Sequence, residues 1–248
     1  MSEQGEYIDF GFEDIPKAEK AEKVRGVFSS VASNYDLMND LMSLGVHRLW
    51  KQHLISMMQP KPHQHLMDVA GGTGDIARLF MARGGGAVTL CDLTPAMLEE
   101  GRRRSLDGGY GENLQWVCGA AESLPFGDCG YHTYSISFGL RNVTERCQAL
   151  SEAYRVLRPG GKFFCLEFSP QVLPALQKMY DVYSDALLPR LGQWIAGDAD
   201  SYRYLVESIR RFRDPNGLCD DLASVGFARV KMTALSGGIV YIHQGFKP

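Results

Sequence analysis

The sequence lacks the features that mark membrane-spanning, disulfide-bonded or metal-binding proteins. No apolar run reaches the roughly 18 residues that a transmembrane helix needs. Its six cysteines show no C-x-x-C spacing, and its six histidines show no H-E-x-x-H spacing. We therefore expect buried, reduced thiols, no bound metal, and a cytoplasmic protein whose membrane association is at most peripheral, on the inner face of a membrane.

An excess of positive charge is also missing. The formal net charge of the 248 residues is −3, so there is no electrostatic argument for binding nucleic acid. A hydrophobic content of 45% and this length suit one globular domain with a complete core. Because residues 1–22 are acidic and polar, we expect them to form a flexible leader, with residues 23–248 forming the domain.

The most informative segment is Asp68-Val-Ala-Gly-Gly-Thr-Gly-Asp75, a glycine-rich turn between an expected strand over residues 66–70 and a helical pattern. Its glycines allow a sharp turn that brings backbone N–H groups against a ligand. In a dinucleotide loop, G-x-G-x-x-G, the third glycine would fall on Ala77. Asp68 and Asp75 would repel a pyrophosphate but could hold a cofactor with an ammonium and a sulfonium, such as S-adenosylmethionine. A NAD-linked enzyme is the weaker alternative.

A second acidic residue follows about twenty positions later. The segment Ala87–Asp92 is expected to be the next strand, and Asp92 at its end is placed to accept hydrogen bonds from ribose hydroxyls. The alternative is that Asp92 only ends the strand before a helix that begins at Thr94-Pro95.

Strand-like and helical segments alternate along most of the chain. This alternation predicts an α/β fold with a doubly wound, Rossmann-like, mostly parallel sheet, and the short joint at residues 236–238 predicts a C-terminal antiparallel hairpin. Such a sheet is the layout of class I methyltransferases. A helical cover is expected over residues 23–60, and a helical insertion rich in aromatic residues over 169–215. The remaining expected strands are 113–118, 131–137, 162–168, 227–234 and 239–245, and the remaining helices are 75–83, one from Pro95, 145–157 and one near 218–225.

Five further segments narrow the family. They are Asn34–Trp50, Ser137–Val143, Leu166–Phe168, Ser201–Arg210 and Gly237–His243. Together with the glycine loop, they closely resemble the ubiquinone/menaquinone biosynthesis C-methyltransferase family over about residues 24 to 247. The resemblance implies transfer of a methyl group from S-adenosylmethionine to a ring carbon of a polyprenylated quinol. The quinol would be 2-methoxy-6-polyprenyl-1,4-benzoquinol, demethylmenaquinol or both.

The resemblance and the loop together give a set of expected cofactor residues. Where the family usually carries Asn or Asp, this chain has Ala120, so we expect weaker cofactor binding by about 0.5–1.5 kcal/mol, with the backbone N–H of Ala121 still available to the adenine ring. The full set is Asp68, Gly71, Gly72, Thr73, Gly74, Asp92, Leu93, Ala120, Ala121 and Ser137.

Methylation of an aromatic carbon requires that a neighbouring hydroxyl lose its proton. Arg141, expected just past a strand end at the crevice, could stabilise the phenolate, and Asn142 could hydrogen-bond its oxygen, with Tyr35 from the cover completing the catalytic set. Alternatively, Arg141 pairs with Glu167 or Asp68 and joins two strand ends. Water, Tyr35, Glu167 and His243 are all open as proton acceptors. Further expected substrate contacts are His47, Arg48, Phe138, Glu167 and Tyr202.

Other functions stay open at this stage. The chain could methylate a different phenolic or lipid acceptor, or it could be a non-catalytic quinone-binding scaffold subunit. The aromatic residues over 170–212 are either ordinary core or a channel for an isoprenoid tail. Expected partners are the polyprenylated quinol, a membrane surface, other enzymes of quinone biosynthesis and a second copy of the chain.

Overall fold

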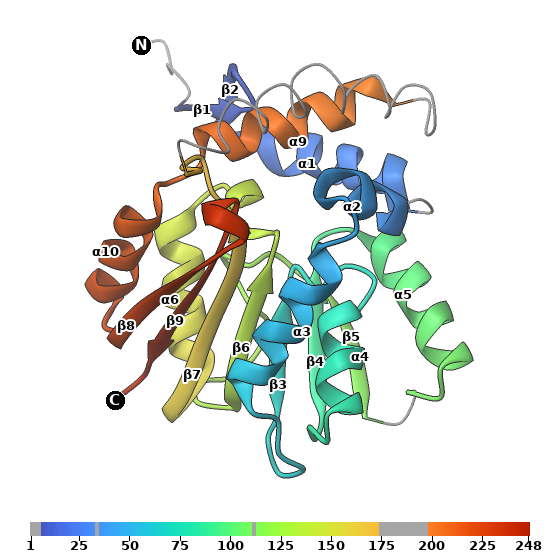
Figure 1. The fold of residues 1–248 in the computed structure, drawn as a ribbon, viewed down its shortest axis with the longest axis vertical. Helices are drawn as coiled ribbons and strands as arrows, with labels where there is room; N and C mark the ends of the chain where they lie inside the picture. The colour runs from blue at the N-terminus through green and yellow to red at the C-terminus, as the bar shows by residue number, and fades with distance from the viewer. Residues whose placement is uncertain (1–5, 33–34, 111–112, 174–197) are drawn as a thin grey trace.

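The computed structural model describes residues 6–32, 35–110, 113–173 and 198–248, and their centre is a seven-stranded sheet (Figure 1). The strand order is β5-β4-β3-β6-β7-β9-β8, and β9 runs antiparallel to both of its neighbours while the other neighbouring pairs are parallel. The strands are β3 (Leu66–Val69), β4 (Val88–Asp92), β5 (Leu114–Cys118), β6 (Tyr131–Ser137), β7 (Leu157–Phe168), β8 (Ala228–Leu235) and β9 (Val240–Phe246).

Helices cover both faces of this sheet. Strands β3, β4 and β6 are buried nearly throughout, and alternate side chains point to opposite faces: Leu66 packs into one core cluster, whereas Met67 and Val69 pack into the other. The predicted doubly wound α/β fold with a terminal hairpin is therefore confirmed. The first cluster includes side chains of α3 (His47–Met58), α4 (Asp75–Ala82) and α5 (Pro95–Asp107), and the second those of α6 (Arg146–Val156) and α10 (Pro215–Val225).

The topological switch point lies between β3 and β6. The chain runs outward from β3 through β4 to β5 and then returns to form β6 on the other side of β3. The two central strands are in register, with Val69 opposite Ile136. Connections that leave their carboxyl ends in opposite directions open a crevice there, which is where ligands bind in such sheets.

A separate layer of elements lies across the carboxyl ends of the strands (Figure 1). It contains the hairpin β1 (Tyr7–Phe10) and β2 (Glu13–Pro16) and the helices α1 (Lys17–Val31), α2 (Tyr35–Ser43) and α9 (Ala199–Arg211). Two helices of the expected cover, α1 and α2, lie in this layer, but α1 begins at Lys17 and not near residue 23. The third, α3, packs on a face of the sheet instead. No helix of the described residues has the length and apolar character to cross a membrane.

The expectation of a flexible leader is wrong for residues 7–22, which form the hairpin and the first part of α1. Contacts with α9 explain the difference. Phe12 N donates to Glu207 Oε2 over 3.0 Å, and the ring of Phe10 stacks on Tyr204 with centroids 4.2 Å apart. Polar local composition could not reveal this order, because the stabilising partners lie almost 200 residues away.

Most element boundaries agree with the sequence to within a few residues, and β6 and the start of α5 agree fully. The largest difference in the sheet is β7, which begins at Leu157 although the expected strand begins at residue 162. In the helical insertion, α9 lies within the described residues, whereas residues 174–197 lie outside them.

The expectation that the cysteines are buried holds for only two of them. Cys91 and Cys165 are buried in the sheet. Cys118, Cys129 and Cys147 are exposed, because they lie at a strand end, in a loop and on the outer face of a helix. Apolar neighbours in the sequence did not distinguish these positions.

Candidate active site

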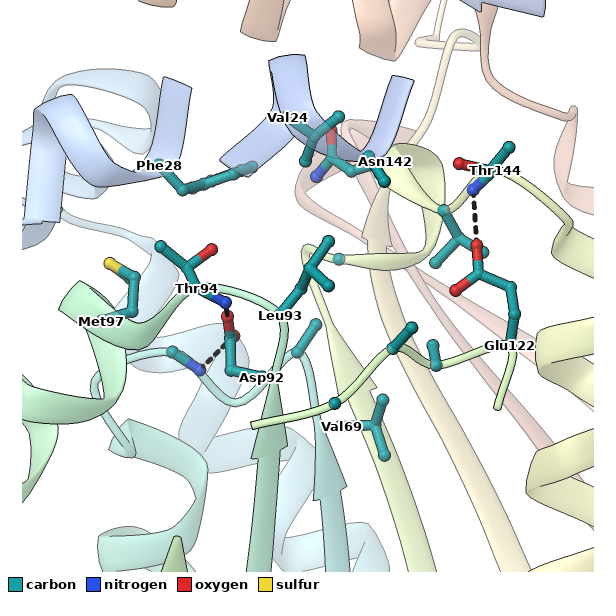
Figure 2. A pocket seen from close by; sticks show the side chains of 18 of the residues that line it. Val24, Phe28, Val69, Asp92, Leu93, Thr94, Met97, Glu122, Asn142 and Thr144 are labelled. Atoms are coloured by element: carbon teal, nitrogen blue, oxygen red, sulfur yellow. Dashed lines mark hydrogen bonds between the residues drawn. The ribbon is translucent and has the colours of Figure 1, made fainter. Parts of the chain in front are cut away.

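A cavity of about 270 Å³ lies at the switch point, below α1 (Figure 2). Val69 at the end of β3 and Asp92 and Leu93 at the end of β4 lie on its sheet side. Val24 and Phe28 of α1 face them from the opposite side. The sheet therefore supplies the floor, and the N-terminal helix supplies a cover that restricts access of water.

The loop between β3 and α4 needs its glycines. A Cβ on Gly71 would lie 2.5 Å from Leu90 Cγ, so the strand β4 leaves no room for a side chain there. Gly72 and Gly74 have φ angles of +54° and +83°, a left-handed conformation that other residues adopt only with strain. The loop can thus pass close to a ligand in the cavity, as its sequence predicted.

Asp92 is held in one orientation at the end of β4. Gly72 N donates to its Oδ2 and Thr94 N to its Oδ1, both over 2.8 Å (Figure 2). Burial raises the pKa of Asp92, although these two backbone donors oppose the shift. Each carboxylate oxygen keeps a second lone pair, so the group can accept hydrogen bonds from a diol such as a ribose.

A smaller polar recess adjoins the cavity, and Tyr35 and Phe138 line both. Three buried oxygens of this recess make no hydrogen bond with the described residues: Asp68 Oδ2, Thr73 Oγ1 and Ser137 Oγ. Buried polar atoms normally have partners, so these three atoms are suited to a ligand that brings polar groups. Burial raises the pKa of Asp68 to about 7 even though Ser135 Oγ donates to its other oxygen over 2.6 Å.

Asp75, the second carboxylate of the glycine loop, differs from Asp68. It accepts from Lys51 Nζ over 2.7 Å and from Arg78 Nη2 over 2.6 Å. Burial alone would raise the pKa of Asp75, but these two cations lower it. Of the two loop carboxylates, Asp68 is therefore the one with an unpaired oxygen.

The structure brings two of the three expected catalytic residues to the cavity. Tyr35 and Asn142 line it, and Tyr204 of α9 donates its hydroxyl to Asn142 Oδ1 over 2.9 Å. Arg141 is not among the lining residues of this cavity; its Nη1 donates to Glu167 Oε1 over 2.6 Å and to Phe138 O over 2.8 Å. Of the two partners considered for Arg141, the structure therefore shows Glu167.

Several expected substrate residues lie elsewhere. Phe138 lines the cavity, whereas His47 and Arg48 both pair with Asp40 and are absent from its lining. Tyr202 is fully buried, is not among the lining residues, and its hydroxyl makes no hydrogen bond with the described residues. Glu167 is also absent from the lining. Its carboxylate accepts hydrogen bonds from the Arg141 side chain and from the backbone N–H groups of residues 141 and 168.

The sequence did not single out every residue that the cavity uses. Val24 and Phe28 fall within the expected helical cover without being singled out, although their i, i+4 spacing could have indicated one shared face. Tyr204, whose hydroxyl bonds to Asn142, falls within the expected aromatic insertion. Nothing local marked Glu122, which follows β5 and lines the cavity. Met97 and Thr144 are further lining residues that the sequence did not indicate, as are Ala21, Val143 and Glu145.

The comparison with known proteins identifies the family. Residues 17–247 match the ubiE/COQ5 methyltransferase family, which covers nearly the whole chain. The chain belongs to this family. A protein of Roseobacter denitrificans named ubiquinone/menaquinone biosynthesis C-methyltransferase UbiE is 53% identical over 96% of both chains, and a protein of the same name from a Ruegeria species is 54% identical over the same shares.

Solved structures with low sequence identity share the fold. A SAM-dependent methyltransferase of Thermotoga maritima matches with a TM-score of 0.65 at 16% identity, covering 91% of this chain and 100% of that one. Another, from Aquifex aeolicus, matches with a TM-score of 0.59 at 13% identity, covering 88% of this chain and 97% of that one. At these identities the likeness extends to the fold alone.

Proposed function

We propose that this chain transfers a methyl group from S-adenosylmethionine to a ring carbon of a polyprenylated quinol in ubiquinone or menaquinone biosynthesis. The substrates would be 2-methoxy-6-polyprenyl-1,4-benzoquinol, demethylmenaquinol or both. The family match and the names of relatives at about 50% identity support the reaction class. The observation that carries the proposal is the oriented Asp92 carboxylate in a covered cavity beside the glycine loop.

The residues present fit S-adenosylmethionine. Asp92 can accept from the ribose hydroxyls, and the unpaired oxygen of Asp68 can accept from the ammonium of the methionine portion. Thr73 and Ser137 offer hydroxyls to the same portion. The bound cofactor supplies an electrophilic methyl group on a sulfonium, and the chain orients it and excludes water.

The acceptor side of the proposed site is formed by Tyr35, Phe138 and Asn142. The amide of Asn142 is oriented by Tyr204, so it can hydrogen-bond a quinol oxygen and fix the ring. Burial raises the pKa of Tyr35, so its hydroxyl stays protonated and acts as a hydrogen-bond donor. Arg141 holds the carbonyl of Phe138 and thereby positions this segment without lining the cavity itself.

The proposal assigns the phenol proton to water. Tyr35 is protonated at neutral pH and cannot accept it. Glu167 is paired with Arg141, and His243 bonds to Pro215 O over 2.9 Å outside the cavity lining. Water in the cavity is thus the acceptor that remains from the four considered.

Methyl transfer with a labelled donor tests this function. Purified protein is incubated with isotopically labelled S-adenosylmethionine and each quinol type, and the label is located by mass spectrometry. We expect label on a ring carbon of at least one prenylated quinol, and none with Asp92→Ala, which lacks the ribose acceptor. Label on an unrelated phenol alone would support a different acceptor, and binding of the donor without any transfer would support a scaffold subunit.

The proposal also includes peripheral contact with a membrane, because a polyprenyl tail resides in lipid. Leu37, Leu44 and Leu49, here called the leucine patch, have exposed fractions of 37%, 73% and 64%. They lie on α2, on α3 and in the turn between them, and Tyr35 at the start of α2 lines the cavity. Their place on the segment that begins with Tyr35 supports this surface as the one that meets the bilayer.

A further inference from the structure

One carboxylate of the cavity has no part in the proposed reaction. Glu122 follows β5, and its Oε1 accepts from Thr144 N over 2.8 Å and from Glu145 N over 3.3 Å. Its Oε2 makes no hydrogen bond with the described residues, and Figure 2 shows it on the cavity side of the group. The side chain is therefore fixed through one oxygen and presents the other to a ligand.

Glu122 and Asp92 lie at opposite ends of the cavity floor (Figure 2). Between them the floor is apolar, with Val69 and Leu93 visible in the same view. This order of groups matches a nucleoside. A ribose bonded to Asp92 would lay its base over the apolar floor and direct the far edge of the base toward Glu122.

We propose that Glu122 Oε2 accepts a hydrogen bond from the exocyclic amine of adenine and so makes the cavity selective for an adenine nucleoside. This inference rests on the proposed binding of S-adenosylmethionine in this cavity. Ala120, which lines the same cavity, carries no polar side chain that could receive the amine. Thr144 N is a donor that bonds to Glu122 Oε1, so it cannot accept from the amine.

Lys20, the cation near Glu122, does not bond to the free Oε2. The charge of Glu122 favours the protonated form of Lys20, but Lys20 Nζ lies 3.6 Å from Asp9 Oδ2, and it donates no hydrogen bond to Glu122 among the described contacts. A 6-oxo purine such as hypoxanthine would direct its carbonyl oxygen toward this carboxylate. Two acceptors facing one another repel, so the site would reject that base.

The substitution Glu122→Gln isolates this contact. The amide oxygen can still accept from Thr144 N, so the loop keeps its connection. The amide nitrogen then replaces Oε2 and donates a hydrogen bond. It would repel an amine and favour a 6-oxo group, so the variant should change base preference and not affinity in general.

Calorimetric titration with S-adenosylhomocysteine and S-inosylhomocysteine tests the proposal. The two ligands differ in the amine or oxo group of the base. We expect the wild-type protein to prefer the adenosyl ligand by about tenfold to a hundredfold, the range for a hydrogen bond to a charged group. Glu122→Gln should lower this ratio at least about tenfold. Glu99→Gln is the matched control, because Glu99 is an exposed carboxylate of α5 outside the cavity lining, and it should leave the ratio unchanged.

Two results would overturn the proposed role of Glu122 and leave the proposed binding of S-adenosylmethionine intact. One is equal binding of both ligands to the wild-type protein, a measurement that does not depend on whether the variant folds. The other is an equal loss of both affinities in Glu122→Gln, which a purely structural role would produce. If the wild-type protein bound neither ligand, the proposed use of S-adenosylmethionine would fail as well.

Discussion

At the residue scale, Arg141 and Glu167 form a buried ion pair behind the cavity. Their side chains are 3% and 1% exposed, and Glu167 also accepts from backbone N–H groups. Removing one partner would leave a buried charge without compensation. We expect Arg141→Ala to lower the free energy of unfolding by about 3–5 kcal/mol, measured by chemical denaturation.

A paired variant gives the control for this prediction. Replacing Arg141 and Glu167 together by methionine removes both charges and should recover most of the lost stability. Because Arg141 holds the Phe138 segment and does not contact Asp92, the single variant assayed below its unfolding temperature should lose kcat by more than it loses cofactor affinity. Unchanged stability in Arg141→Ala would contradict the role of the pair.

Asp68 should make the stability of the protein depend on pH. Burial raises its pKa to about 7 from the ordinary value of 3.8, so between these values the folded state binds the proton more tightly than the unfolded state. Its contribution to stability is therefore lost as pH rises from about 4 through 7. We expect Asp68→Asn to flatten the pH dependence of the unfolding free energy in this window, measured by urea denaturation. An unchanged slope would show that the carboxyl is ionised in the folded protein.

At the element scale, α1 covers the side of the cavity that lies opposite the sheet. Phe28 is half-buried and faces the floor of the cavity, so its loss should admit water more than it disturbs folding. We expect Phe28→Ala to weaken binding of S-adenosylhomocysteine about tenfold, equivalent to about 1.4 kcal/mol, by calorimetry. The exposed Arg25 of the same helix gives the control Arg25→Ala, which should bind normally. Equal affinities in all three proteins would mean that α1 does not contact the cofactor.

Most helices and strands could be predicted from the sequence, but the tertiary contacts between distant elements could not. Strand β6 and the N-terminus of α5 matched the sequence because a short run rich in aromatic and β-branched residues and a Thr-Pro start are local signals. The hairpin β1–β2 was missed because it depends on Glu207 and Tyr204 of α9. A four-residue strand of mixed polarity carries too little local signal to be recognised without those contacts.

At the scale of the whole molecule, the leucine patch should determine attachment to lipid. Burying one exposed leucine in the interface contributes about 1.5 kcal/mol, or roughly tenfold in partitioning. We expect Leu44→Gln with Leu49→Gln to reduce co-sedimentation with phospholipid vesicles at least about tenfold without a change in Tm. Leu106→Gln is the control, because Leu106 is 71% exposed on α5, outside the patch. Equal loss in the control would show that no particular surface meets the bilayer.

The sequence by itself determined the order of strands and helices in the main sheet, the glycine loop and the acid at the end of β4, because each depends on spacing within a few neighbouring residues. The tertiary structure decided which charged groups are available in the cavity. Lys51 pairs with Asp75, 24 positions away, and Glu167 pairs with Arg141, 26 positions away. One oxygen of Asp68 and one of Glu122, in contrast, have no hydrogen-bond partner among the described residues. Charge pairing depends on distances between segments that meet only when the chain folds, and no local pattern encodes those distances.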